Sequence, residues 1–378
     1  MKFKYISFFL IFFFLFAFNI SYAQNSTLNS NKETFEKAKV LDILDSGTTT
    51  PLGTDTIAPS QSLKVLILNG VDSGQTITFK NDYIQLIKGQ TFYIHHIVNN
   101  LDDSENYWSV ADPYRLNILL ELTIVFIILI FVFGGIQGVR GLASLIGSFI
   151  LIFFLLIPSI YAGHNVIFVS IGVSSIIIIV GSYITHGFNR TTTSAVFGMI
   201  LTVIVTGALA YYFVYAAHLS GFSTEESVSL NLNTRGSIDF IGLLFGGIMI
   251  GLLGVLYDIA IGQAVTIEEL CALSKDLSRI EIYKRAIRIG REHIGALINT
   301  LAIAYVGVSL PLLLFIQGSN NSIFFLINNE VFSTEIIRIL IGSIGLILGV
   351  PITTLISSYM LYGKVSKLKK VDDYHHHH

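Results

Sequence analysis

The sequence predicts an α-helical polytopic membrane protein with a small all-β domain at its N-terminal end. Three observations support this fold class. Hydrophobic residues make up 52% of the chain and charged residues only 13%, whereas roughly a quarter of the residues of a soluble protein are charged. Seven apolar runs are each long enough to cross a bilayer, which takes about 20 residues. A polar stretch of short alternating segments precedes these runs.

The first 23 residues have the features of a secretory signal peptide. Lys2 and Lys4 precede an apolar run over residues 6–20, and Ser21-Tyr22-Ala23 provides a small-x-small site before a polar stretch. We therefore expect a signal peptide over residues 1–23. An uncleaved N-terminal anchor is the alternative.

Residues 24–113 contain no run that could span a membrane, and we expect them to form an extracytoplasmic β domain with its linker. Alternating segments separated by turn signals predict a small antiparallel barrel or sandwich. The segments are 39–44, 63–68, 76–80 and 91–98. We expect Ser46–Pro59 to be a loop, and Asp102–Glu105 with Asp112-Pro113 to lead into the membrane. His95 and His96 are adjacent in a predicted strand and face opposite ways, so they are not expected to share a metal ion.

Residues 114–362 are expected to form the transmembrane domain, followed by a cytoplasmic tail over 363–378. The seven predicted spans are 116–134, 142–160, 166–184, 195–217, 239–262, 294–316 and 336–360. Loops after the first, third and fifth spans carry Arg140, Arg190 and a basic cluster over 275–291, whereas the other loops carry only Arg235. Basic residues are retained on the cytoplasmic side, so the N-terminal domain is predicted outside and the C-terminus inside.

Glycines recur at helical spacing in the fifth and seventh predicted spans. Such small residues let helices approach closely in lipid, which is the first interpretation; a hinge or unwound segment is the second. The glycines are Gly242, Gly246, Gly247, Gly251 and Gly254 in one span and Gly342, Gly345 and Gly349 in the other.

A group of polar residues lies at the cytoplasmic end of the fifth and sixth predicted spans. A carboxylate such as Asp258 inside a membrane helix costs several kcal/mol unless it is paired or hydrated. The candidate binding residues are Asp258, Gln263, Glu269, Arg291, Glu292, Asn299 and Thr300. They form either a substrate or ion site or a set of interhelical hydrogen bonds, and catalysis is the least favoured interpretation. No metal site and no cofactor is expected.

Two motifs in this region resemble those of the YibE/F family of bacterial membrane proteins. The run Gly254–Ala260, with Glu268-Glu269-Leu270 after it, resembles the family's Gly-x-x-Met-Asp-Val-Ala core and following Glu. The run Gly290–Gly307 resembles Gly-Arg-Asp-x-x-Gly-Thr-x-x-Asn-Thr-Leu followed by Ala-Tyr and Gly. The chain departs from these motifs by having Tyr257 for Met, Gly262 and Val265 for two serines, Glu292 for Asp and Ala296 for Thr. The resemblance implies a multi-pass protein of the bacterial inner, or cytoplasmic, membrane with a permease-like role.

The leading expectation is therefore transport of a small solute or ion through a polar site between the fifth and sixth spans. The alternative is a non-transporting membrane assembly or envelope factor whose outer β domain binds an extracytoplasmic protein partner. An enzyme is not expected, because the motifs of common hydrolases and nucleotide-binding loops are absent from the sequence. A nucleic-acid partner is not expected either, because no basic patch interleaved with aromatic residues occurs.

Overall fold

The computed structural model describes residues 32–50, 57–98, 107–273, 276–319 and 321–364. The chain divides into two units within its first long helix, between Ile127 and Ile128. The predicted signal peptide, and the predicted tail beyond residue 364, lie outside the described residues.

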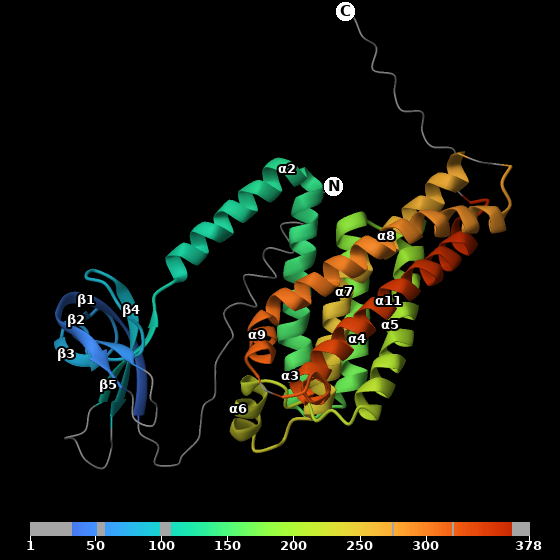
Figure 1. Ribbon diagram of the computed structural model, residues 1–378. Helices are drawn as coiled ribbons and strands as arrows, with labels where there is room; N and C mark the ends of the chain where they lie inside the picture. The colour runs from blue at the N-terminus through green and yellow to red at the C-terminus, as the bar shows by residue number, and fades with distance from the viewer. Residues whose placement is uncertain (1–31, 51–56, 99–106, 274–275, 320, 365–378) are drawn as a thin grey trace, which may run out of the picture. The chain divides into compact units, whose positions relative to one another are not determined.

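The N-terminal unit contains one antiparallel sheet of five strands, as Figure 1 shows. The strand order is β3-β2-β1-β4-β5. The strands are β1 (Lys32–Thr49), β2 (Ala58–Ile67), β3 (Thr76–Asn81), β4 (Thr91–Val98) and β5 (Tyr107–Pro113).

The long strand β1 is shared between the two halves of this sheet. Its residues Lys32–Lys39 pair with β4, and Ala38–Thr49 pair with β2. The register shifts between Val40 and Asp42, and an irregularity of this kind bends a strand. Alternate side chains are buried in a core made of Ala38, Val40, Leu63, Val65, Leu86, Phe92, Ile94 and Val110.

The four predicted strands are present, but two segments were assigned wrongly. β1 and β2 extend into Ser46–Pro59, which was expected to be a loop, although residues 51–56 of that segment lie outside the described residues. β5 occupies the end of the expected linker, including Asp112-Pro113. Pro113 is the last residue of this edge strand, a position where proline costs no ladder hydrogen bond.

The second part of the chain is helical. Its elements are α2 (Leu116–Leu151), the π-helix η1 (Ile152–Leu156), α3 (Ile157–Tyr161), α4 (Val166–His186), α5 (Arg190–Ala216), α6 (Glu225–Thr234), α7 (Phe240–Leu273), α8 (Arg279–Val308), α9 (Leu310–Gly318), α10 (Ile323–Asn328) and α11 (Glu330–Leu361).

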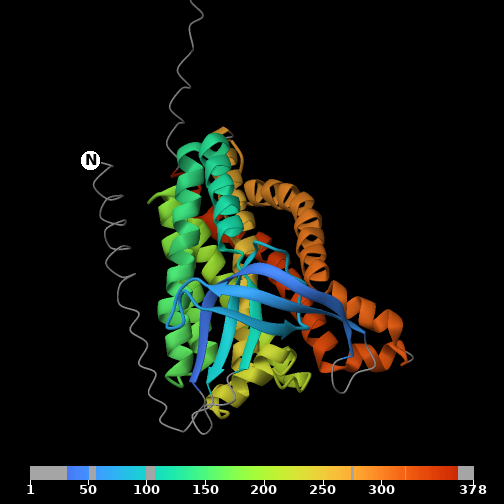
Figure 2. The same cartoon turned by 90° about the vertical axis from the view of Figure 1, so that its left-hand side faces the viewer.

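Five described helical segments are long and apolar enough to cross a membrane, or six if α8 and α9 form one bent span. α8 and α9 meet at an angle of 65°, and Pro311 lies in the first turn of α9; Figure 2 shows this turn of the chain. The first two predicted spans fall in one 46-residue stretch, Leu116–Tyr161, whose backbone is non-helical at Gly135. The count of seven spans therefore stays a prediction.

Helices α4, α5, α7 and α11 pack together, and α8 lies against α7 and α11 (Figure 1). Glycines allow several of these contacts. A Cβ on Gly345 would lie 2.9 Å from Leu252, and one on Gly349 would lie 2.8 Å from Leu256. The close-approach interpretation is confirmed for these positions of α11. Neither α7 nor α11 is interrupted, so the alternative of an unwound segment is wrong for both helices.

Candidate functional site

Gln263 is the one predicted site residue whose side chain is buried between helices, with 2% of its surface exposed. Its Oε1 atom accepts a hydrogen bond of 2.9 Å from the Thr354 hydroxyl on α11. Its Nε2 atom lies against Gly290 of α8, where a Cβ would come within 2.7 Å. Gln263 therefore connects α7 with both α8 and α11.

Asp258 lies on a different face of α7 and is exposed. Gly254 and Gly262 lie one turn away on either side, and no described atom falls within 4 Å of the place where their Cβ atoms would be. This face of α7 is therefore not packed against the described protein.

Two contacts place Asp258 and Asn299 at the same level of the helix pair. Gly251 of α7 meets Tyr305 of α8, where a Cβ would lie 2.5 Å from the Tyr305 hydroxyl, and Gln263 meets Gly290. The two helices therefore run antiparallel. Asp258 lies between Gly251 and Gln263, and Asn299 lies between Gly290 and Tyr305, so both occupy the middle of the aligned stretch.

The structure does not join the seven predicted residues into one bonded cluster. Within the described residues, no hydrogen bond or ion pair links any two of them, and Asp258 and Arg291 in particular are not paired. Thr300 donates a hydrogen bond of 2.9 Å to the Ala296 carbonyl within its own helix. The exposed members are Asp258, Glu269, Arg291, Glu292, Asn299 and Thr300.

A row of buried hydroxyl groups between α5 and α11 was not predicted. The Ser194 and Ser357 hydroxyls lie 2.9 Å apart, and both side chains are fully buried. The Thr353 hydroxyl lies against Gly198, and within the described chain it has no hydrogen-bond partner. Serine and threonine recur at helical spacing on both helices, and this recurrence is the sequence signal that could have predicted the row. The row consists of Ser194, Thr202, Thr206, Thr353 and Ser357.

A second unpredicted polar group lies near the start of α11. Arg338 forms an ion pair of 2.9 Å with Glu335, and its guanidinium is 6.0 Å from the centre of the Tyr305 ring. The Arg338 Nε atom is buried without a partner among the residues described. Because Tyr305 also meets Gly251, this group adjoins α7 at the opposite end of the aligned stretch from Gln263.

Tyr257, the residue next to Asp258, binds the neighbouring helix. Its hydroxyl donates a hydrogen bond of 3.3 Å to the Gly181 carbonyl of α4. A methionine at this position, as in the motif that the sequence resembles, has no hydroxyl group to make this bond.

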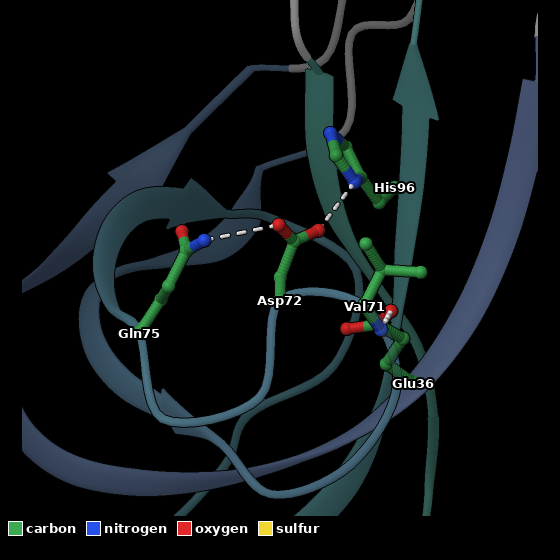
Figure 3. Close-up of polar contacts among 5 residues, drawn as sticks. All are labelled: Glu36, Val71, Asp72, Gln75 and His96. Carbon is green, nitrogen blue, oxygen red and sulfur yellow. Dashed lines mark hydrogen bonds and ion pairs between the residues drawn. The ribbon is translucent and has the colours of Figure 1, made fainter.

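In the N-terminal unit, buried polar side chains hold the loop after β2 against the sheet, as Figure 3 shows. Glu36 accepts a hydrogen bond of 2.8 Å from the Val71 amide, and His96 Nδ1 lies 3.2 Å from an Asp72 oxygen. The His96 ring stacks on Trp108 with ring centres 3.6 Å apart, whereas His95 lies 3.3 Å from Glu33 on the other face. The two histidines therefore face opposite ways, as predicted. Nowhere in the described ranges could three or more His, Cys, Asp or Glu residues together hold a metal ion.

Comparison with known proteins identifies the helical part. The model of the family described as YibE/F-like protein matches residues 122–363, which run from within α2 to just beyond the end of α11. No curated protein and no solved structure matches the chain.

Proposed function

Because the chain belongs to the YibE/F-like protein family, we propose that it is a permease-like membrane protein that moves a small cation along helix α7. The observation that carries this proposal is the exposed Asp258 carboxylate in a helix long and apolar enough to span a membrane. The proposal is for a transporter and assigns no catalytic residue.

An isolated carboxylate cannot be left in hydrocarbon without a large cost in free energy, so it must meet water, a cation or another polar group. Asp258 has no ion-pair partner in the described part of the chain. Its position between two open glycine positions leaves room for a ligand on that side of α7. An ionised, unpaired carboxylate attracts a cation and repels an anion.

Two oxygen-bearing side chains of α8 at a similar level would suit a hard cation, which prefers oxygen ligands. Asn299 lies at the level of Asp258 and offers an amide carbonyl, and the Thr300 hydroxyl is its neighbour. In this proposal Asp258 supplies the charge, and Asn299 and Thr300 supply neutral oxygen atoms. Gln263 positions α7 against α8 and α11 rather than binding the ion.

The predicted topology gives the remaining charged residues a place in the same proposal. Basic loops on alternate sides favour a bacterial inner-membrane protein with its β domain outside and its C-terminus in the cytoplasm. Glu269, Arg291 and Glu292 would then surround the cytoplasmic entrance.

The proposal is tested by flux measurements on the full chain in proteoliposomes that contain internal dyes for protons, sodium or potassium. Asp258→Asn should abolish the flux that the wild-type protein shows, with little change in thermal stability. Asp276→Asn, which removes an exposed carboxylate from the loop before α8, should retain the flux. Equal cation flux in the wild-type protein and the Asp258→Asn variant would refute the role assigned to this carboxylate, as would no flux above that of empty liposomes.

A second pair of variants separates an ion site from a structural ion pair. If Asp258 were paired with Arg291, Asp258→Asn would destabilise the protein by about 3–5 kcal/mol, and adding Arg291→Gln would restore stability. We expect neither effect. A large loss rescued by the double substitution would contradict the proposal while leaving family membership intact.

A further inference from the structure

The sheet of the N-terminal unit leads directly into the first apolar helix. The Tyr114 amide donates a hydrogen bond of 3.0 Å to the Thr91 carbonyl, and α2 begins two residues later at Leu116. Residues of α2 from Leu116 onward are mostly exposed and apolar. A membrane helix begins near the boundary between headgroups and hydrocarbon, which is where a span starting at Leu116 would place Tyr114.

Strand β1 brings a lysine to the same level. The Lys37 Nζ atom donates a hydrogen bond of 3.0 Å to the Tyr114 hydroxyl and lies 4.1 Å from the centre of its ring. The hydrogen bond to Tyr114 raises the pKa of Lys37 above its ordinary value. The Tyr93 ring lies 5.8 Å from the Tyr114 ring. Lysine and tyrosine are the residue types that anchor proteins at membrane interfaces.

A turn adds an exposed apolar residue beside this group. Val40 binds the turn through two backbone hydrogen bonds of 2.9 Å, to Gly89 and Gln90, and Gln90 precedes Thr91. Ile87 begins the turn, and 70% of its surface is exposed. The adjacent Lys88 is paired with Asp42 at 3.0 Å, so Ile87 supplies the exposed apolar side chain of this turn.

We propose that these residues form an interfacial surface through which the β domain contacts the lipid headgroup layer. The surface consists of Lys37, Ile87, Tyr93 and Tyr114. The occupant is the bilayer rather than a protein, because Tyr114 is joined through a single residue to a helix of membrane-spanning composition. The inference does not depend on transport.

Depth-dependent quenching of a fluorescent label tests this surface on the full chain. In a Cys271→Ser background, which removes the one native cysteine, Ile87→Cys would be labelled with an environment-sensitive fluorophore. The protein would be placed in nanodiscs of phosphatidylcholine and phosphatidylglycerol that contain a lipid with a nitroxide on its headgroup.

Tyr107→Cys is the matched control, since 62% of the Tyr107 surface is exposed. Tyr107 is the first residue of β5 and lies roughly 20 Å along this strand from Pro113, the residue before Tyr114. We expect the nitroxide to cause a loss of fluorescence at position 87 and none at position 107. No loss at position 87, or equal loss at both positions, would overturn the proposal. A surface that serves a protein partner would leave both labels in water in this purified system.

Discussion

At the scale of single residues, the contact between α5 and α11 depends on the absence of one side chain. A Cβ on Gly198 would lie 2.5 Å from the Thr353 hydroxyl oxygen and 2.8 Å from the Thr353 Cα atom. The backbone of α11 would have to move, so Gly198→Ala should lower the free energy of unfolding by about 1–3 kcal/mol. Thermal unfolding in detergent measures this loss.

Gly172→Ala on α4 is the matched control, because no described atom lies within 4 Å of its Cβ position. It should be neutral or stabilise the protein by up to about 1 kcal/mol through helix propensity. Equal effects of the two alanines would show that α5 and α11 are not closely packed at Gly198.

The hydrogen bond between Gln263 and Thr354 makes a second prediction at this scale. Thr354→Val removes the donor while keeping the shape, and a double-mutant cycle with Gln263→Leu should give a coupling energy of about 0.6–2 kcal/mol. Thr353→Val provides the control, since this hydroxyl has no partner within the described chain and its loss should not destabilise. A coupling energy of zero would mean that the two side chains do not interact.

At the scale of elements, the break in α2 decides whether Leu116–Tyr161 can be two spans. At roughly 1.5 Å per residue, 46 residues extend about 69 Å, more than twice the thickness of a hydrocarbon core. Gly135 has φ 51° and ψ −142°, which a residue with a side chain rarely adopts.

Gly135→Ala should therefore destabilise the protein by about 1–3 kcal/mol, as expected for a residue forced into a strained backbone conformation. Gly134→Ala is the control, because its Cβ would make an ordinary contact of 3.9 Å with Ile130. Thermal unfolding of both variants checks the prediction, and a stable Gly135→Ala protein would show that the break is not required.

Some elements were predictable from the sequence because their signals are local. The membrane spans are predictable from the apolar composition of each run alone. The strands β2, β3 and β4 are predictable because apolar and polar residues alternate along them. β5 was missed because its short Tyr107–Pro113 segment lies among acidic residues and ends in proline, which suggested a linker. The bend between α8 and α9 at Pro311 was not predictable from the sequence, because a membrane helix can contain proline without breaking.

At the scale of the whole molecule, orientation in the membrane is the clearest open prediction. With Cys271 replaced by serine, a membrane-impermeant maleimide added outside should label Asn233→Cys in α6. It should not label Lys284→Cys in α8, because the basic loops are predicted to lie in the cytoplasm. Permeabilised cells provide the control for reactivity at both positions. The reverse pattern would place the Glu269, Arg291 and Glu292 side chains on the outer face.

The candidate site was harder to predict than the membrane class. Asp258 was identifiable because a lone carboxylate is conspicuous in an apolar run. The pairing of Ser194 with Ser357 was not, because the two residues are 163 positions apart and hydroxyls in membrane helices usually bond to their own backbone. The predicted cluster assumed that residues at a similar depth in the membrane contact one another. In the structure, Gln263 and Asp258 lie on different faces of α7, so Gln263 is buried and Asp258 is exposed.

The stacked pair of His96 and Trp108 gives the molecule an internal optical reporter. Trp108 is the one tryptophan in the sequence and lies in β5, so indole emission comes entirely from the β domain. Circular dichroism near 222 nm is dominated by the helices. Recording both signals during one denaturation would therefore follow the two units separately, and the resulting midpoints would show whether they melt as one cooperative system or as two.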